Sequence, residues 1–191
     1  PTFDHFNLQT LHIIFHSKLV SRDAEKLGKA ISRQKGLKDL KLDFNYGQVE
    51  GGCLEYLGAA MPSLNLRKFT FWLKTLVNCQ PFFKKIKTKM QLESLELSFL
   101  VLTEAEMNLL AEALQQQATL QSLTFKTRFP SGSSFEALMK GMKKLVSLKE
   151  LDFSIEKDSK GINHQHFVNM LPCLPNLTRF CFFDGDNSIT D

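Results

Sequence analysis

Residues 37–44 read LKDLKLDF and place leucine at positions 37, 40 and 42 and phenylalanine at position 44. From Leu40 onward the apolar residues alternate with polar ones, which is typical of a β-strand with one buried face. The same order of apolar positions returns along the whole chain, so the pattern indicates an internal repeat. Its seven copies begin at Leu8, Leu37, Leu66, Leu92, Leu120, Leu148 and Leu177, with successive steps of 29, 29, 26, 28, 28 and 29 residues.

Between the copies, the apolar spacing changes to that of an amphipathic helix. Helices are expected over residues 21–34 and 103–117, among others. Two Ser/Thr-x-x-Glu sequences fit capping boxes at helix starts, namely Thr103 with Glu106 and Ser133 with Glu136. Each repeat therefore predicts one strand followed by one helix.

A single strand–helix unit cannot cover its own apolar face, whereas stacked units bury a continuous core. The pattern predicts an α/β fold of the solenoid type, a horseshoe arc with a parallel sheet on the concave face and helices on the convex face. We expect one domain over residues 1–191, with strands starting near residues 8, 37, 66, 92, 120, 148 and 177. Because the chain starts at Pro1 and enters a repeat at once, we also expect a fragment of a longer protein with flanking domains.

Repeats of this length, with a full helix after L-x-x-L-x-L, resemble the ribonuclease-inhibitor class of leucine-rich-repeat proteins. That class includes inhibitors, innate-immune sensors, GTPase-activating proteins and cytoskeletal regulators, so the resemblance implies a fold more than a function. The class has Asn or Cys at the ninth motif position, and here only Asn45 fits. The eighth position is apolar in five of seven copies, which predicts a hydrophobic spine formed by Phe15, Phe44, Leu73, Phe99 and Ile155.

Composition indicates an ordinary globular domain, because 43% of the residues are hydrophobic and 23% are charged. The net charge of +4 is small for a dedicated nucleic-acid binder, so nucleic acid is not an expected partner. Cys53, Cys79, Cys173 and Cys181 form no CxxC pair, which favours free thiols in a cytoplasmic, intracellular protein. No apolar run is long enough to span a membrane.

If the fourth and sixth motif positions face the core, the third, fifth and seventh line the concave face. That face is polar and of mixed charge. We expect a partner protein to contact the following residues on it: His12, Asp39, Lys41, Asp43, Lys68, Thr70, Trp72, Glu96, Lys126, Glu150, Asp152 and Arg179. Trp72, the only tryptophan, has two interpretations. It is either an interface anchor or a side chain tucked against a neighbouring loop of the irregular third repeat.

Two other groups of residues are candidates for binding phosphate or a metal ion. The lysine-rich runs 84–89 and 140–144 fall on the expected outer helices, where solvated lysines are the rule and a phosphate-binding patch is the alternative. His164 and His166 are two residues apart and diverge on a helix, so we expect no metal site. We expect no cofactor either.

No GxSxG, GxxxxGK[ST] or HExxH motif is present. The carboxylates of Asp39, Asp43, Glu150 and Asp152 share the concave face, but an open sheet offers no desolvated cleft for acid–base catalysis. We therefore do not expect an enzyme.

The leading hypothesis is a non-catalytic protein–protein interaction module that binds a partner protein on its concave sheet face, because a rigid, pre-formed surface loses little entropy on binding. The resemblance implies one alternative, a GTPase-activating or other regulatory leucine-rich-repeat protein. A second alternative is a structural repeat segment within a larger assembly, since neither terminal repeat carries an obvious polar cap.

Overall fold

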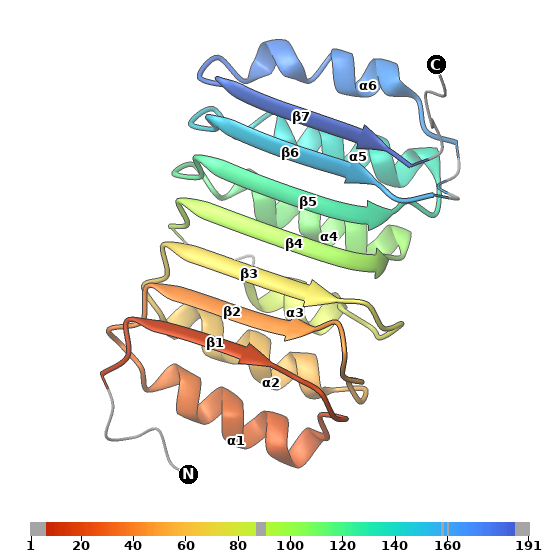
Figure 1. Ribbon diagram of the computed structural model, residues 1–191. Helices are drawn as coiled ribbons and strands as arrows, with labels where there is room; N and C mark the ends of the chain where they lie inside the picture. Colours follow the sequence, from red (N-terminus) through yellow and green to blue (C-terminus); the bar gives the residue numbers. More distant parts are fainter. Residues whose placement is uncertain (1–6, 87–90, 158, 160, 186–191) are drawn as a thin grey trace.

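The computed structural model describes residues 7–86, 91–157, 159 and 161–185. Seven strands form one sheet in chain order, β1-β2-β3-β4-β5-β6-β7, and every neighbouring pair is parallel. Helices alternate with the strands and lie on one face of the sheet, while the other face is left open (Figure 1). The chain is therefore an α/β protein with a single parallel sheet.

The elements follow one another regularly, each α-helix after the strand of the same number. The strands are β1 (Thr10–Ile14), β2 (Asp39–Phe44), β3 (Lys68–Leu73), β4 (Ser94–Val101), β5 (Ser122–Arg128), β6 (Glu150–Ile155) and β7 (Arg179–Asp184). The helices are α1 (Ser21–Ser32), α2 (Cys53–Ala60), α3 (Gln80–Ile86), α4 (Glu104–Gln115), α5 (Gly132–Met142) and α6 (His164–Val168), with 3-10 turns η2 (Met61–Ser63) and η3 (Leu171–Cys173).

Each strand begins two residues after the first leucine of its motif, later than the positions expected from the sequence. The reason is that this leucine belongs to the turn that leads from the helix into the strand. Leu37 and Leu120 are buried, and their N–H groups donate to the carbonyls of Gln34 and Gln117, three residues earlier. The leucine thus packs into the core while its backbone still closes a turn.

The sheet register aligns equivalent motif positions of successive repeats. Leu40 lies opposite Phe69, and Phe69 lies opposite Leu95. These side chains are buried because they point to the helix-covered face, as the fourth-position prediction required. The large, fully buried side chains of the core include many phenylalanines, namely Phe44, Phe69, Phe71, Phe82, Phe83, Phe99, Phe125, Phe129, Phe135 and Phe153.

The predicted apolar spine is confirmed. Phe44, Leu73, Phe99 and Ile155 are almost completely buried. Phe15 is only partly buried, but its ring stacks on that of Phe44 with 4.2 Å between centroids. Asn45, the one residue that matches the usual ninth position, leaves its Oδ1 without a hydrogen-bond partner among the described residues.

Of the two predicted capping boxes, one is confirmed and one is wrong. Thr103 caps α4, and its side chain and that of Glu106 exchange hydrogen bonds with each other's backbone N–H. At α5 the cap is Ser131, whose hydroxyl accepts from the N–H of Ser134. Ser133 therefore lies inside the helix, where it donates to Glu104 instead.

Candidate functional site

The structure places all twelve predicted contact residues on the strands of one sheet. They alternate with side chains that pack into the core, so they belong to the face that the helices leave open (Figure 1). Two of them are more enclosed than expected, because Asp43 and Thr70 are each only 3% exposed. Neighbouring side chains cover them.

Trp72 is the centre of a contact network that spans β2, β3 and β4. The Lys41 ammonium nitrogen lies 3.5 Å from the centroid of its ring, in the geometry of a cation–π interaction. The indole Nε1–H donates to Glu96 Oε1 over 3.0 Å. Trp72 is only partly buried, and both of these contacts come from the neighbouring strands, which hold the ring on the open face.

Two enclosed residues extend this network. Asp43 accepts a 2.9 Å hydrogen bond from the N–H of Asn45, and its Oδ2 lies 3.7 Å from Lys41 Nζ. Thr70 Oγ1 donates to Glu96 Oε2 over 3.5 Å. We call Lys41, Asp43, Thr70, Trp72 and Glu96 the open-face cluster. These contacts hold the side chains of the cluster to one another on the open face of the sheet.

Five of the seven remaining predicted residues form ion pairs between neighbouring repeats. Arg179 Nη2 donates to Glu150 Oε2 over 2.9 Å, and this hydrogen bond and charge raise the pKa of Arg179. His12 Nε2 lies 3.6 Å from Asp39 Oδ1, and Lys126 Nζ lies 3.2 Å from Glu156 Oε1. Lys68 and Asp152 have no ion-pair partner within 4.0 Å in the described part of the chain.

The carboxylates of β2 and those of β6 do not meet. Three strands, β3, β4 and β5, separate the two, which corresponds to roughly 19 Å at the usual spacing between strands. Asp39 and Asp43 therefore cannot share a proton or a ligand with Glu150 and Asp152. No carboxylate pair therefore forms between β2 and β6.

The two histidines of α6 point to different partners. His164 Nε2 lies 2.8 Å from Asp184 Oδ2, and His166 Nε2 lies 3.9 Å from Glu136 Oε2. Among the described residues, no three His, Cys, Asp or Glu side chains gather as metal ligands do. The four cysteines are free thiols.

The lysine-rich runs lie at the ends of outer helices. Lys84 and Lys85 occupy the last turn of α3, and residues 87–89 lie outside the described part of the chain. In the second run, Lys140 Nζ pairs with Glu136 Oε1 at 2.7 Å.

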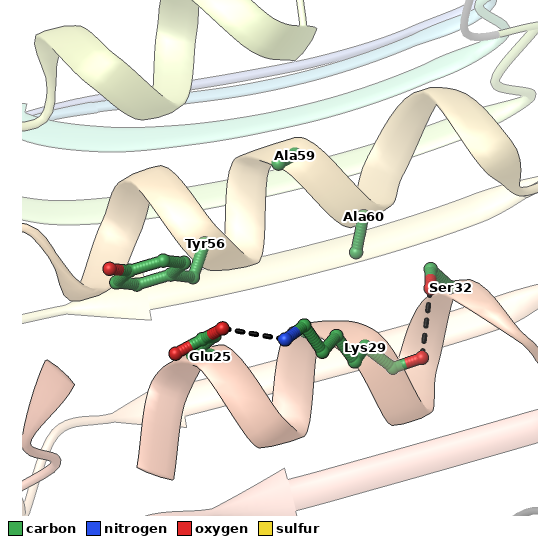
Figure 2. A pocket seen from close by; sticks show the side chains of 7 residues that line it. Glu25, Lys29, Ser32, Tyr56, Ala59 and Ala60 are labelled. Atoms are coloured by element: carbon green, nitrogen blue, oxygen red, sulfur yellow. Dashed lines mark hydrogen bonds and ion pairs between the residues drawn. The ribbon is translucent and has the colours of Figure 1, made fainter. Parts of the chain in front are cut away.

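A hollow between α1 and α2 was not predicted from the sequence (Figure 2). Its volume is about 260 Å³, and its lining includes Gly28, Tyr56 and Ala60. A Cβ atom on residue 28 would lie 2.6 Å from the Tyr56 carbonyl oxygen, so glycine permits the close helix approach. The polar groups at the rim already pair with each other, as Lys29 Nζ does with Glu25 Oε1 at 2.6 Å.

Glu106 has a role beyond its capping box. Its Oε1 accepts from the backbone N–H of Cys79, in the loop after β3, and its Oε2 accepts from Thr103. This buried carboxylate therefore joins two successive repeats. The capping box itself is visible as Thr-x-x-Glu, but the contact with Cys79 has no local signal.

Comparison with protein-family models gives no match, and comparison with curated proteins gives no significant match. No helix of the described residues combines the length and the apolar character needed to cross a bilayer.

Proposed function

We propose that the chain is a leucine-rich-repeat solenoid of the ribonuclease-inhibitor-like class. Three observations support this: the strands follow chain order without reversal, the third to seventh motif positions pair with their equivalents between all neighbouring strands, and the helices share one face (Figure 1). A doubly wound sheet of the dinucleotide-binding type has helices on both faces and a point where strand order reverses. Stacked identical units have neither.

We further propose that the protein is a non-catalytic interaction module that binds a partner protein on the open face of the sheet. The open-face cluster is the observation that carries this proposal. It combines a large aromatic ring, a cation held over it and two carboxylate acceptors, buried Asp43 and partly buried Glu96, that are already oriented. Tryptophan surrounded by fixed polar groups is typical of the centre of a protein interface.

The test compares two doubly substituted baits in affinity capture from a cell extract. The first carries Trp72→Ala with Lys41→Glu on the open face. The second carries Tyr56→Ala with Lys29→Glu, which removes an aromatic ring and reverses a lysine in the helix-side hollow of Figure 2. Circular dichroism and unfolding curves establish that both baits keep the wild-type fold.

We expect a protein that wild type and the helix-side bait retain and that the open-face bait loses. Since hot-spot residues carry about 2 kcal/mol or more each, the captured amount is expected to fall at least tenfold. Capture that survives on the open-face bait and disappears from the helix-side bait overturns the proposal.

A further inference from the structure

The residue just before each strand, the second motif position, forms a row along the edge where the strands begin, at the left of Figure 1. The row consists of Gln9, Lys38, Arg67, Glu93, Gln121, Lys149 and Thr178, all exposed. Backbone hydrogen bonds of 2.8 Å from Arg67 N to Lys38 O, and from Glu93 N to Arg67 O, place these residues side by side. Within this row, two cations are neighbours only at Lys38 and Arg67.

Two further lysines, Lys35 and Lys68, lie beside this pair. Lys35 Nζ donates to the carbonyl of Ser63 over 3.3 Å, and Lys38 Nζ donates to that of Asn65 over 3.4 Å. Neutral carbonyl acceptors leave the positive charge of both lysines uncompensated. Lys68, the exposed first residue of β3, adds another cation. We call Lys35, Lys38, Arg67 and Lys68 the basic edge.

Two carboxylates adjoin the basic edge. Asp39 lies on the open face with His12 at 3.6 Å. Glu93 Oε1 lies 3.7 Å from Arg67 Nε, in a pair whose side chains are 49% and 67% exposed. An ion pair so long and so solvated holds its members weakly, so a competing carboxylate can take its place on Arg67. Four cations against two carboxylates leave the edge positive.

A polar hollow of about 600 Å³ opens beside the basic edge. Its polar lining residues are Lys38, Asn65, Arg67, Gln91 and Glu93, and Pro62, Leu64 and Leu66 complete the lining. Amide N–H groups and a guanidinium are the donors that a carboxylate group accepts from. The hollow therefore offers both charge and directional hydrogen bonds to an acidic side chain.

We propose that the basic edge binds a short acidic segment of a partner protein. The two cations of the row come just before adjacent strands, which lie about 5 Å apart, and the next positions are Glu93 and Gln121. Such a patch fits a run of a few carboxylates. Among the described residues of the row, a nucleic-acid strand would carry its phosphates past Glu93 without a matching cation, and none of those that line the hollow is aromatic and able to stack on a base.

The test is fluorescence anisotropy with a fluorescein-labelled peptide that contains a short run of Glu and Asp. Its controls are the same peptide with Gln and Asn at those positions and a labelled oligothymidine of similar length. The protein variants are Lys38→Glu with Arg67→Glu, the milder Lys38→Gln with Arg67→Gln, and a charge-matched control, Arg22→Glu with Lys26→Glu, on α1. Trp72→Ala separates this surface from the open-face cluster.

We expect the acidic peptide to bind wild type, the α1 control and the Trp72 variant equally. The Lys38/Arg67 charge reversal is expected to weaken binding at least tenfold, and the glutamine pair to weaken it to an intermediate degree. Equal loss in the α1 control, equal binding of the Gln/Asn peptide, or tighter binding of oligothymidine overturns the proposal. Because Trp72→Ala leaves this surface intact, failure here and failure of the open-face proposal are distinguishable.

Discussion

Truncation of Phe71 to alanine tests whether the phenylalanine core connects neighbouring repeats. The Phe71 side chain, on β3, is fully buried. Its ring stacks on Phe82 of α3 with 4.6 Å between centroids, and it lies 5.8 Å from Phe44 and 5.7 Å from Phe99. One ring thus contacts the strand before it, the strand after it and its own helix.

The expected cost follows from this burial. Removal of a fully buried phenylalanine leaves a cavity that the surrounding structure fills only in part, at a cost of about 3–5 kcal/mol. Domains have a free energy of unfolding of about 5–15 kcal/mol, so Phe71→Ala is expected to remove a large part of it. The melting temperature is expected to fall by on the order of 10 °C.

The assay is urea unfolding followed by circular dichroism, with Phe183→Ala as the matched control because that phenylalanine is 60% exposed on the open side of β7. We expect the control to change the unfolding free energy by less than about 1 kcal/mol. Equal losses in the two variants, or a loss below about 1 kcal/mol for Phe71→Ala, would refute the idea that these rings form one continuous core.

Three further predictions concern other parts of the structure. Lys41→Ala removes the cation over the single tryptophan. The free energy of unfolding should therefore fall by about 1 kcal/mol, and acrylamide should quench Trp72 fluorescence more strongly. Unchanged quenching would contradict the contact between Lys41 and Trp72. Glu106→Ala removes the acceptor shared by Thr103 and Cys79 and should lower the free energy of unfolding in urea by about 2 kcal/mol. The control Glu55→Ala, on the exposed surface of α2, should lower it by less than about 0.5 kcal/mol. Burial, with Glu106 beside it, raises the pKa of the Cys79 thiol well above its usual range. The folded state therefore keeps that thiol protonated, and stability should fall as pH rises past the ordinary thiol pKa of 9.0. In thiol labelling followed by mass spectrometry, the exposed Cys181 should react in the native protein and Cys79 only after unfolding; equal rates would exclude the buried position.

Most of the strand and helix order was predictable because it depends on local periodicity. Alternation around Leu40 and Leu42 identifies β2, and the same reading identifies the other six strands. Strand starts were placed two residues early because leucine at the first motif position looks the same in a turn as in a strand. The cap of α5 was misassigned because Ser131, Ser133 and Ser134 are chemically alike, and only the backbone path selects Ser131.

The sequence predicted which residues lie on the open face of the sheet, but not which of them contact each other. Period-two alternation places Lys41, Trp72 and Glu96 on one face of a sheet. That Lys41 covers the ring and that Glu96 holds the indole N–H depends on side-chain conformers across three strands, for which no local pattern exists.

The repeat pattern was enough to predict seven strands, a helix after each of the first six, and an apolar spine, because each segment carries the alternation and spacing that its own element needs. Which side chains contact each other depends on the way the repeats pack together. Residues 26–29 positions apart become neighbours through the sheet register, and this register aligns Lys38 with Arg67 at the basic edge and keeps the acids of β2 away from those of β6. Contacts between distant segments depend on how whole units stack, and that is a property of the packed core rather than of any one segment.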